Sequence, residues 1–278
     1  MAIQVNRREM LALIGAATAA RAWADTALLH PTRIDHVSLA VKDIDQAMMF
    51  YRTLFGNDVM KDNKTARRFQ RIGPCYLSIA PAAAGQAVRI GHICAGVQNA
   101  EMVAAAKTAV EKAGLPVKGS NRDFTITDPD GINFQVAANN AWPKMPNAAP
   151  EAGGNGEPPL FRAIGMHHVN VRVSDMEKST AFYRKLLGDV IRHQGNPPQP
   201  RFNAGETTFG LYYPAAGKQP DVDHFSVLVE PFDAAAAVKK LQAMGAKAKL
   251  AKNGSLNEFY DAQGIRLQVS TVDPAANH

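Results

Sequence analysis

A duplicated motif constrains the fold of this chain more than any other feature. Residues 35–43 read DHVSLAVKD, and residues 167–175 read HHVNVRVSD. Each copy alternates apolar and polar residues, which predicts a half-buried strand, and each carries histidine at its second position. A Phe-Tyr-Arg segment follows at 50–52 and again at 182–184, so the offset between the copies stays at 132 residues. An offset of that size indicates a duplicated domain and not the short unit of a solenoid.

The two halves share one order of predicted elements: a strand, a helix and three strands, given twice. The chain has 278 residues, of which 46% are hydrophobic and 20% charged, and this is enough for two domains with their own cores. We expect the first domain at residues 33–138 and the second at 165–271. Residues 139–164 are rich in Pro, Gly, Asn and Ala and lack periodicity, which predicts an interdomain linker.

The N-terminus has the features of an export signal. Residues 1–24 contain the pair Arg7-Arg8, an apolar run at 10–20 and the sequence Ala22-Trp23-Ala24, which suits a cleavage site. This pattern predicts a signal peptide of the twin-arginine type and a periplasmic or secreted protein. An apolar run of about 11 residues is too short to span a bilayer, so we expect no membrane contact after cleavage. The alternative is a frayed amphipathic helix.

Charge and cysteine content limit the possible functions further. The formal charge is +6, and it falls to +4 when residues 1–24 are removed. No cluster of Lys and Arg alternates with aromatic residues, so we expect no nucleic-acid partner. Cys75 and Cys94 would enter an oxidising compartment, where they could pair, but two small buried side chains in neighbouring strands are the favoured interpretation.

Three motifs together resemble the vicinal oxygen chelate superfamily. They are the H-V-x-hydrophobic-x-V start of each strand, the A-x-x-F-Y-R-x-L-x-G helix ending at Gly56, and the D-P-D-G turn at 128–131 before a final strand. That superfamily includes glyoxalase I, bleomycin-resistance proteins, methylmalonyl-CoA epimerase and type I extradiol dioxygenases. The resemblance implies an α+β fold with tandem glyoxalase-like domains, each of two βαβββ units forming a curved mixed sheet around an open cavity. The double domain is most similar to the extradiol dioxygenase layout.

The resemblance also implies a set of metal ligands in each domain. They come from the first strand of each unit and the last strand of the domain: His36, His92 and Gln135, and then His168, His224 and Gln268. The two histidines of each set are 56 residues apart in both domains. A divalent Fe, Mn, Zn or Cu ion is the expected cofactor.

The third ligand departs from the pattern of the family, where a glutamate is usual. The amides of Gln135 and Gln268 bring no charge, so metal affinity should fall and a bound substrate should be anionic. The alternative is an amide that lines the cavity of a decayed metal site. The place of the dioxygenase tyrosine holds Thr125 and Glu258, which counts against ring cleavage.

Four further residues are weaker candidates. Arg68 and Arg201 are at matched places and could clamp a substrate carboxylate, although exposed arginines in a strand pair are commoner. Tyr212 is a candidate for lining the second cavity and Tyr260 for donating a proton, with aromatic packing as the alternative for both.

Two functions remain open from the sequence. The first is an exported metal-dependent enzyme, similar to a dioxygenase or to a glyoxalase-type lyase, that acts on a small substrate with two neighbouring oxygens. The second is a metal-free protein that binds a small molecule, as in the bleomycin-resistance branch. A homodimer is compatible with either function.

Overall fold

The computed structural model describes residues 27–139, 147–154, 156–213 and 217–271. The predicted signal peptide at residues 1–24 lies outside these ranges. Within them, none of the helices has the length and apolar character needed to cross a membrane.

The first domain consists of two βαβββ units in sequence. The first unit contains β1 (Arg33–Val41), α2 (Ile44–Phe55), β2 (Val59–Asp62), β3 (Arg68–Ile72) and β4 (Cys75–Pro81). The second unit contains β5 (Arg89–Val97), α3 (Ala100–Lys112), β6 (Val117–Gly119), β7 (Asp123–Thr127) and β8 (Asn133–Ala138). These strands form one sheet in the order β6-β7-β8-β5-β1-β4-β3-β2.

The second domain repeats this plan. Its first unit contains β10 (Ala163–Arg172), α4 (Met176–Leu187), β11 (Val190–Gln194), β12 (Gln199–Ala204) and β13 (Thr207–Tyr212). Its second unit contains β14 (Asp221–Val229), α5 (Ala234–Ala243), β15 (Lys247–Ala248), β16 (Glu258–Tyr260) and β17 (Arg266–Thr271). Its sheet has the order β11-β12-β13-β10-β14-β17-β16-β15, which confirms the predicted α+β fold of tandem glyoxalase-like domains.

Part of the segment between the domains is ordered against the first sheet. Residues Ala148–Pro150 form β9, which pairs with the edge strand β2 and extends the first sheet to nine strands. Glu151 follows and forms ion pairs with Arg52 at 2.9 Å and Arg68 at 2.5 Å. Phe161 is fully buried in the core. The composition of the segment alone does not reveal these contacts, because a three-residue edge strand has no measurable periodicity.

The two Phe-Tyr-Arg helices are built alike from local signals. Asp43 caps α2 and Asp175 caps α4, and each carboxylate accepts a backbone hydrogen bond from the residue three positions later. Gly56 and Gly188 end these helices with φ values of 95° and 85°, a region that glycine occupies without strain. The apolar face of each helix is therefore fixed relative to the strand that precedes it.

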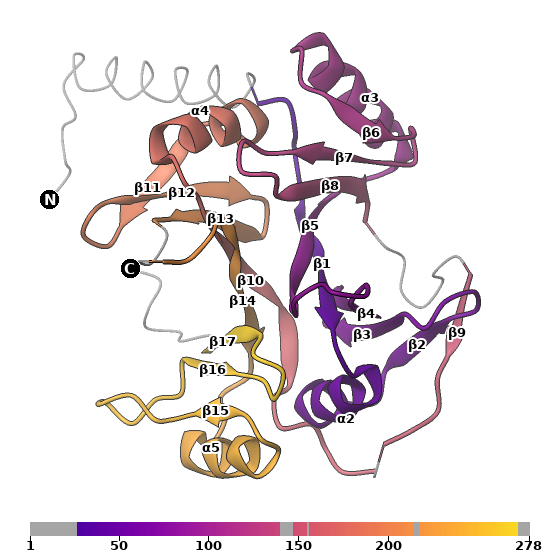
Figure 1. Cartoon of the computed structure of the whole chain (residues 1–278), viewed down its shortest axis with the longest axis vertical. Helices are drawn as coiled ribbons and strands as arrows, with labels where there is room; N and C mark the ends of the chain where they lie inside the picture. Colours follow the sequence, from indigo (N-terminus) through magenta and orange to yellow (C-terminus); the bar gives the residue numbers. More distant parts are fainter. Residues whose placement is uncertain (1–26, 140–146, 155, 214–216, 272–278) are drawn as a thin grey trace, which may run out of the picture.

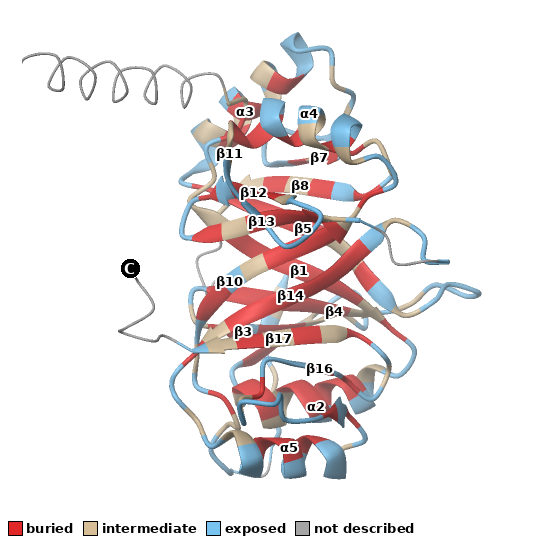
Figure 2. Cartoon of the chain, turned by 90° about the vertical axis from the view of Figure 1, so that its left-hand side faces the viewer, coloured by how far each residue is buried: buried red, intermediate tan, exposed pale blue. Residues whose placement is uncertain are grey.

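The two domains share one hydrophobic core. Buried residues of both sheets form a single continuous cluster, in which Phe134 of β8 lies 5.7 Å from Phe209 of β13 and Phe50 of α2 lies 6.5 Å from Phe259 of β16, measured between ring centroids. Helices α2 and α5 gather at one end of the molecule and α3 and α4 at the other (Figure 1). The central strands are largely buried (Figure 2). Each domain thus completes the core of the other.

Candidate metal and substrate site

Strand register brings the first histidine and the glutamine of each predicted ligand set into one row across three strands. In the first domain His36 on β1 pairs with Cys94 on β5, and Cys94 pairs with Gln135 on β8. In the second, His168 pairs with Ser226 on β14, which pairs with Gln268 on β17. Paired residues point to the same face of a sheet, so both glutamines face the same side as the first histidine of their domain.

The second histidine of each domain completes a histidine pair. The distance between the Nε2 atoms of His36 and His92 is 3.1 Å, and that between the Nε2 atoms of His168 and His224 is also 3.1 Å. Two metal–nitrogen bonds of about 2.1 Å at a right angle place the nitrogens about 3.0 Å apart. The spacing of both pairs therefore suits neighbouring ligands of one divalent ion.

A carboxylate orients one histidine of each pair. The Nδ1 atom of His36 lies 3.1 Å from the carboxylate of Asp35, and the Nδ1 atom of His224 lies 2.5 Å from that of Asp223. An Nδ1–H donated to a carboxylate leaves the lone pair on Nε2, which is the arrangement used by metal-binding histidines. The Asp-His dipeptides were visible in the sequence, but which histidine would have this support was not.

Each glutamine contacts the histidine that lacks the carboxylate. The side chain of Gln135 lies beside His92 and acts to raise its pKa, and that of Gln268 does the same at His168. Burial, with a smaller effect of His36, lowers the pKa of His92 to about 3. Burial, with smaller effects of Arg266 and Arg201, lowers the pKa of His224 to about 3. These imidazoles are neutral at pH 7, as metal ligation requires.

The second domain adds a network of buried donors around its pair. The amide of Asn170 donates to Nε2 of His224 at 2.9 Å, and the guanidinium of Arg201 donates to Oδ1 of Asn170. Arg201 also donates to the hydroxyl of Tyr212 at 3.0 Å and stacks over its ring. On the other side of the pair, Nδ1 of His168 lies 2.8 Å from Nδ1 of His167. Arg201 and Tyr212 thus lie beside the histidine pair of the second domain, and their contact with a substrate stays a prediction.

The structure places Arg68 differently from Arg201. Ser78 of β4 and Gly210 of β13 occupy matching positions in the two domains. Arg201 pairs with Gly210, but Phe69 and not Arg68 pairs with Ser78. Aligning Arg68 with Arg201 was therefore wrong by one position, and a shift of one residue turns a side chain to the opposite face of a strand. Arg68 instead forms the ion pair with Glu151, away from the histidines.

A different arginine approaches the pair of the first domain. Arg67 donates to the hydroxyl of Ser78 at 3.0 Å, and its charge contributes to the lowered pKa of His92. Arg67 precedes β3, so strand alternation does not predict which way its side chain points. Ser78 pairs with Ser38, two residues after His36 on β1, and therefore faces the same side of the sheet as His36.

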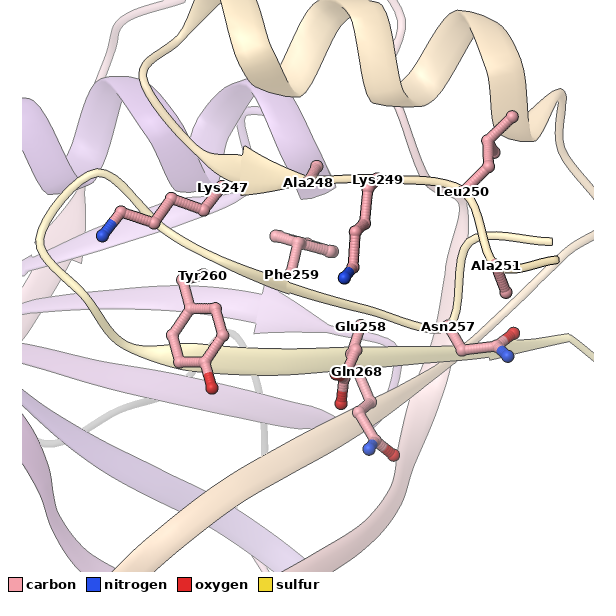
Figure 3. A pocket seen from close by; sticks show the side chains of 10 residues that line it. All are labelled: Lys247, Ala248, Lys249, Leu250, Ala251, Asn257, Glu258, Phe259, Tyr260 and Gln268. Carbon is pink, nitrogen blue, oxygen red and sulfur yellow. The ribbon is translucent and has the colours of Figure 1, made fainter. Parts of the chain in front are cut away.

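A cavity of about 660 Å³ adjoins the glutamine of the second domain. Its polar lining residues are Lys247, Lys249, Asn257, Glu258, Tyr260 and Gln268. Figure 3 shows the side chains of Tyr260, Glu258 and Gln268 projecting from the same side of their strands, while Phe259 does not. Tyr260 is 39% exposed, which leaves its hydroxyl accessible from the cavity.

Glu258 is the acidic group of this cavity. It hydrogen-bonds to Gln268 and Arg266. Burial works to raise its pKa, but the hydrogen bond and charge of Arg266 outweigh burial, so the net pKa is lowered. A carboxylate is therefore present beside the neutral Gln268. The sequence indicates Glu258 only as the residue at the place of the dioxygenase tyrosine.

The two cysteines are buried and not linked to each other. Cys94 lies with Asp35 and His36 in a group whose potential ligand atoms are all within 4.8 Å of one another. Burial and the nearby carboxylate of Asp35 raise the pKa of the Cys94 thiol well above its usual value. A neutral thiol is a weak ligand, so the two histidines and Gln135 stay the predicted donor set of the first domain.

The chain belongs to the glyoxalase/bleomycin resistance protein/dioxygenase superfamily, whose model matches residues 33–136 and again 165–269. Among curated proteins, it is 25% identical over 228 residues to a lactoylglutathione lyase of Schizosaccharomyces pombe, covering 69% of this chain and 70% of the relative.

Solved structures with the same fold come from several branches. The 2,3-dioxygenase LapB from Pseudomonas sp. KL28 matches with a TM-score of 0.65 at 15% identity, covering 91% of this chain and 96% of that one. The Mn(II)-bound glyoxalase from Novosphingobium aromaticivorans matches with a TM-score of 0.62 at 16% identity, covering 87% and 82%. At these identities the structural matches define the fold, and the particular reaction has to be argued from the site.

Proposed function

We propose that this protein is a metal-dependent enzyme of the superfamily, with its active site in the second domain. The observation that carries this proposal is the spacing of 3.1 Å between the Nε2 atoms of His168 and His224, beside a cavity that Gln268 lines. The donors fit a divalent ion because both histidines are kept neutral by burial and His224 is oriented by Asp223.

The bound ion would supply Lewis-acid stabilisation of negative charge on neighbouring substrate oxygens. Neutral ligands leave the charge of the site largely uncompensated, which favours an anionic substrate. Lys247 and Lys249 in the cavity wall also attract an anion. The substrate class is therefore a small anion with two adjacent oxygens.

The chain's own residues support a proton transfer. Glu258 lines the cavity as a carboxylate, so it can accept a proton from a carbon next to a substrate carbonyl, and its pairing with Arg266 lowers its pKa and makes it a weak base. Tyr260 lines the same cavity and can donate a proton to the product side. We therefore propose a lyase or isomerase reaction of the glyoxalase type rather than ring cleavage.

Metal analysis and one pair of variants test this function. Mature protein purified without added metal should contain at least one Fe, Mn, Zn or Cu ion per chain by mass spectrometry. His168→Ala should remove one ion and abolish turnover in a screen of 2-oxoaldehyde adducts and catechols. His193→Ala, on the exposed end of β11, should change neither metal content nor turnover. Full metal content and full activity in His168→Ala would refute the assignment of the site.

One observation favours the alternative of a metal-free binding protein. The Asn170 amide donates to Nε2 of His224, which occupies the lone pair that an ion would need. In that case the histidines and Gln268 act as hydrogen-bond partners of a captured small molecule. Absence of metal after reconstitution with each ion, together with saturable binding of an aromatic ligand, would establish this alternative.

We also propose export to the periplasm by the twin-arginine route, supported by Arg7-Arg8 ahead of the apolar run at 10–20. Fractionation of cells that express the full chain tests this proposal. Replacing both arginines by lysine should leave the uncleaved chain in the cytoplasm. Unchanged processing and export in that variant would rule out the route.

A further inference from the structure

A second, smaller pocket of about 260 Å³ lies where the two domains meet. The first domain contributes the start of β5, and the second contributes the ends of β10 and β16, the starts of β14 and β17, and the loop before β14. The charged residues that line this pocket are Arg89, Arg172, Lys218, Asp221, Asp223 and Arg266. We call it the charged pocket. Four cationic and two anionic side chains leave it with a net positive charge.

Both carboxylates of the charged pocket are already engaged. Asp221 accepts from Arg172 at 2.7 Å. Asp223 is fully buried and contacts Arg266 at 2.6 Å, Arg172, and Nδ1 of His224. Arg266 also pairs with Glu258, which lies outside the lining of this pocket. These carboxylates neutralise Arg172 and Arg266, whereas Arg89 and Lys218 have no carboxylate partner among the described residues.

The remaining cationic groups are not compensated by the described part of the chain. Arg89 and Lys218 have no ion pair or side-chain hydrogen bond with the residues that the structure describes, and both are exposed. The Nε atom of Arg266 is buried without a hydrogen-bond partner among those residues. Like charges that face one pocket repel one another, and a buried N–H without an acceptor is destabilising.

We propose that the charged pocket binds a small oxyanion, either a carboxylate or a phosphate group. Such a group accepts several hydrogen bonds from guanidinium and ammonium donors at once and removes the repulsion between them. The volume suits a small anion and not a nucleotide. This inference does not depend on a bound metal, because the pocket residues that carry it are not the histidine pair.

The oxyanion has two possible sources. Tyr260 lines both the charged pocket and the larger cavity, so the anionic end of a substrate in that cavity could reach Arg266. Alternatively, a free anion such as inorganic phosphate occupies the pocket by itself. The same cationic side chains would recognise the oxyanion from either source. Binding of a short, free anion distinguishes the two.

Calorimetric titration of the mature protein at low salt tests the proposal, with inorganic phosphate and succinate as probes. We expect saturable binding with one anion per chain, weakened at least tenfold by Arg89→Gln and by Lys218→Gln. Lys252→Gln removes one exposed positive charge outside the pocket and should leave the affinity unchanged. Equal weakening in Lys252→Gln, or binding without saturation, would overturn the proposal.

A second measurement separates this site from the histidine pair. His168→Ala should retain phosphate binding, whereas loss of binding in that variant would assign the anion to the metal site and overturn the proposal. Thermal unfolding adds a sign test: without anions, Arg89→Gln should unfold at a higher temperature than the parent because repulsion is relieved. With saturating phosphate the order should reverse. Binding of succinate but not phosphate would indicate the carboxylate end of a substrate as the natural occupant.

Discussion

The hydroxyl of Tyr51 in the first domain donates a hydrogen bond of 3.0 Å to the carboxylate of Asp261 in the second. The reciprocal bond joins Tyr183 of the second domain to Asp128 of the first at 2.9 Å. Each tyrosine belongs to the Phe-Tyr-Arg helix of its domain, and each aspartate begins the turn before the last strand of the other domain. Each domain thus donates the same tyrosine–aspartate hydrogen bond to the other across the domain boundary.

Removing either tyrosine hydroxyl should weaken the contact between the domains. Both tyrosines are fully buried, and Asp128 and Asp261 are at most 5% exposed, so a lost donor is not replaced by water. We expect Tyr51→Phe and Tyr183→Phe each to lower the free energy of unfolding by about 1–3 kcal/mol in urea titrations. Tyr213→Phe, with a 43% exposed side chain, should have no effect. Loss of stability in Tyr213→Phe alone would contradict this reading.

Restoring a carboxylate at the third ligand position should strengthen metal binding. In Gln268→Glu the new charge lies beside Glu258 and is relieved when a divalent ion binds, so we expect a rise in affinity of at least tenfold in competition titrations with a chelator. Gln135→Glu should have the same effect in the first domain. Gln263→Glu, in the turn at 261–264, provides the control. Unchanged affinity in both site variants would exclude the glutamines as ligands.

Gly210 leaves the space that the Arg201–Asn170 contact occupies. A Cβ atom at Gly210 would collide with the guanidinium of Arg201 and the amide of Asn170. We expect Gly210→Ala to lower the free energy of unfolding by about 1–3 kcal/mol and to impair turnover. At Gly91 the nearest atom to such a Cβ is the backbone oxygen of Ser38 at 3.7 Å, so Gly91→Ala should be mild. Equal effects of the two variants would argue against a role for this space.

Acid should destabilise the metal-free protein through its buried histidines. The pKa values of His92 and His224 are about 3 in the folded protein and near 6.5 in the unfolded chain. The unfolded state therefore binds more protons between these values. Stability falls as the pH drops from 6.5 towards 3, by up to about 1.4 kcal/mol per pH unit for each histidine.

The slope of stability against pH tests this assignment. Urea titrations at several pH values, with a chelator present, should give a smaller slope in His92→Asn and in His224→Asn than in the parent protein. His30→Asn changes a histidine at an exposed position before β1 and should leave the slope unaltered. A parent slope that persists in both buried-site variants would show that other groups cause the acid sensitivity.

The sequence predicts which face of the sheet a side chain points to where a repeated motif fixes the alignment of the strand. His36 and His168 follow from their position in the duplicated strand, and His92 and His224 from the same spacing in the second unit of each domain. Arg68 could not be predicted in this way, because β3 and β12 start at different points relative to their hairpin partners. A one-residue difference in register, set by pairing with a distant strand, moved Phe69 into the position of Arg201.

By itself, the sequence determined the duplication, the βαβββ order and the strands that carry the predicted ligands, since these depend on local periodicity, caps and turns. Tertiary structure decided which histidine receives a carboxylate, how Glu258 comes to lie against Gln268, and that Arg89 of one domain faces Arg266 of the other. These relationships join residues far apart in the chain. They depend on strand register and on the packing of the two sheets around one core, which no local pattern encodes.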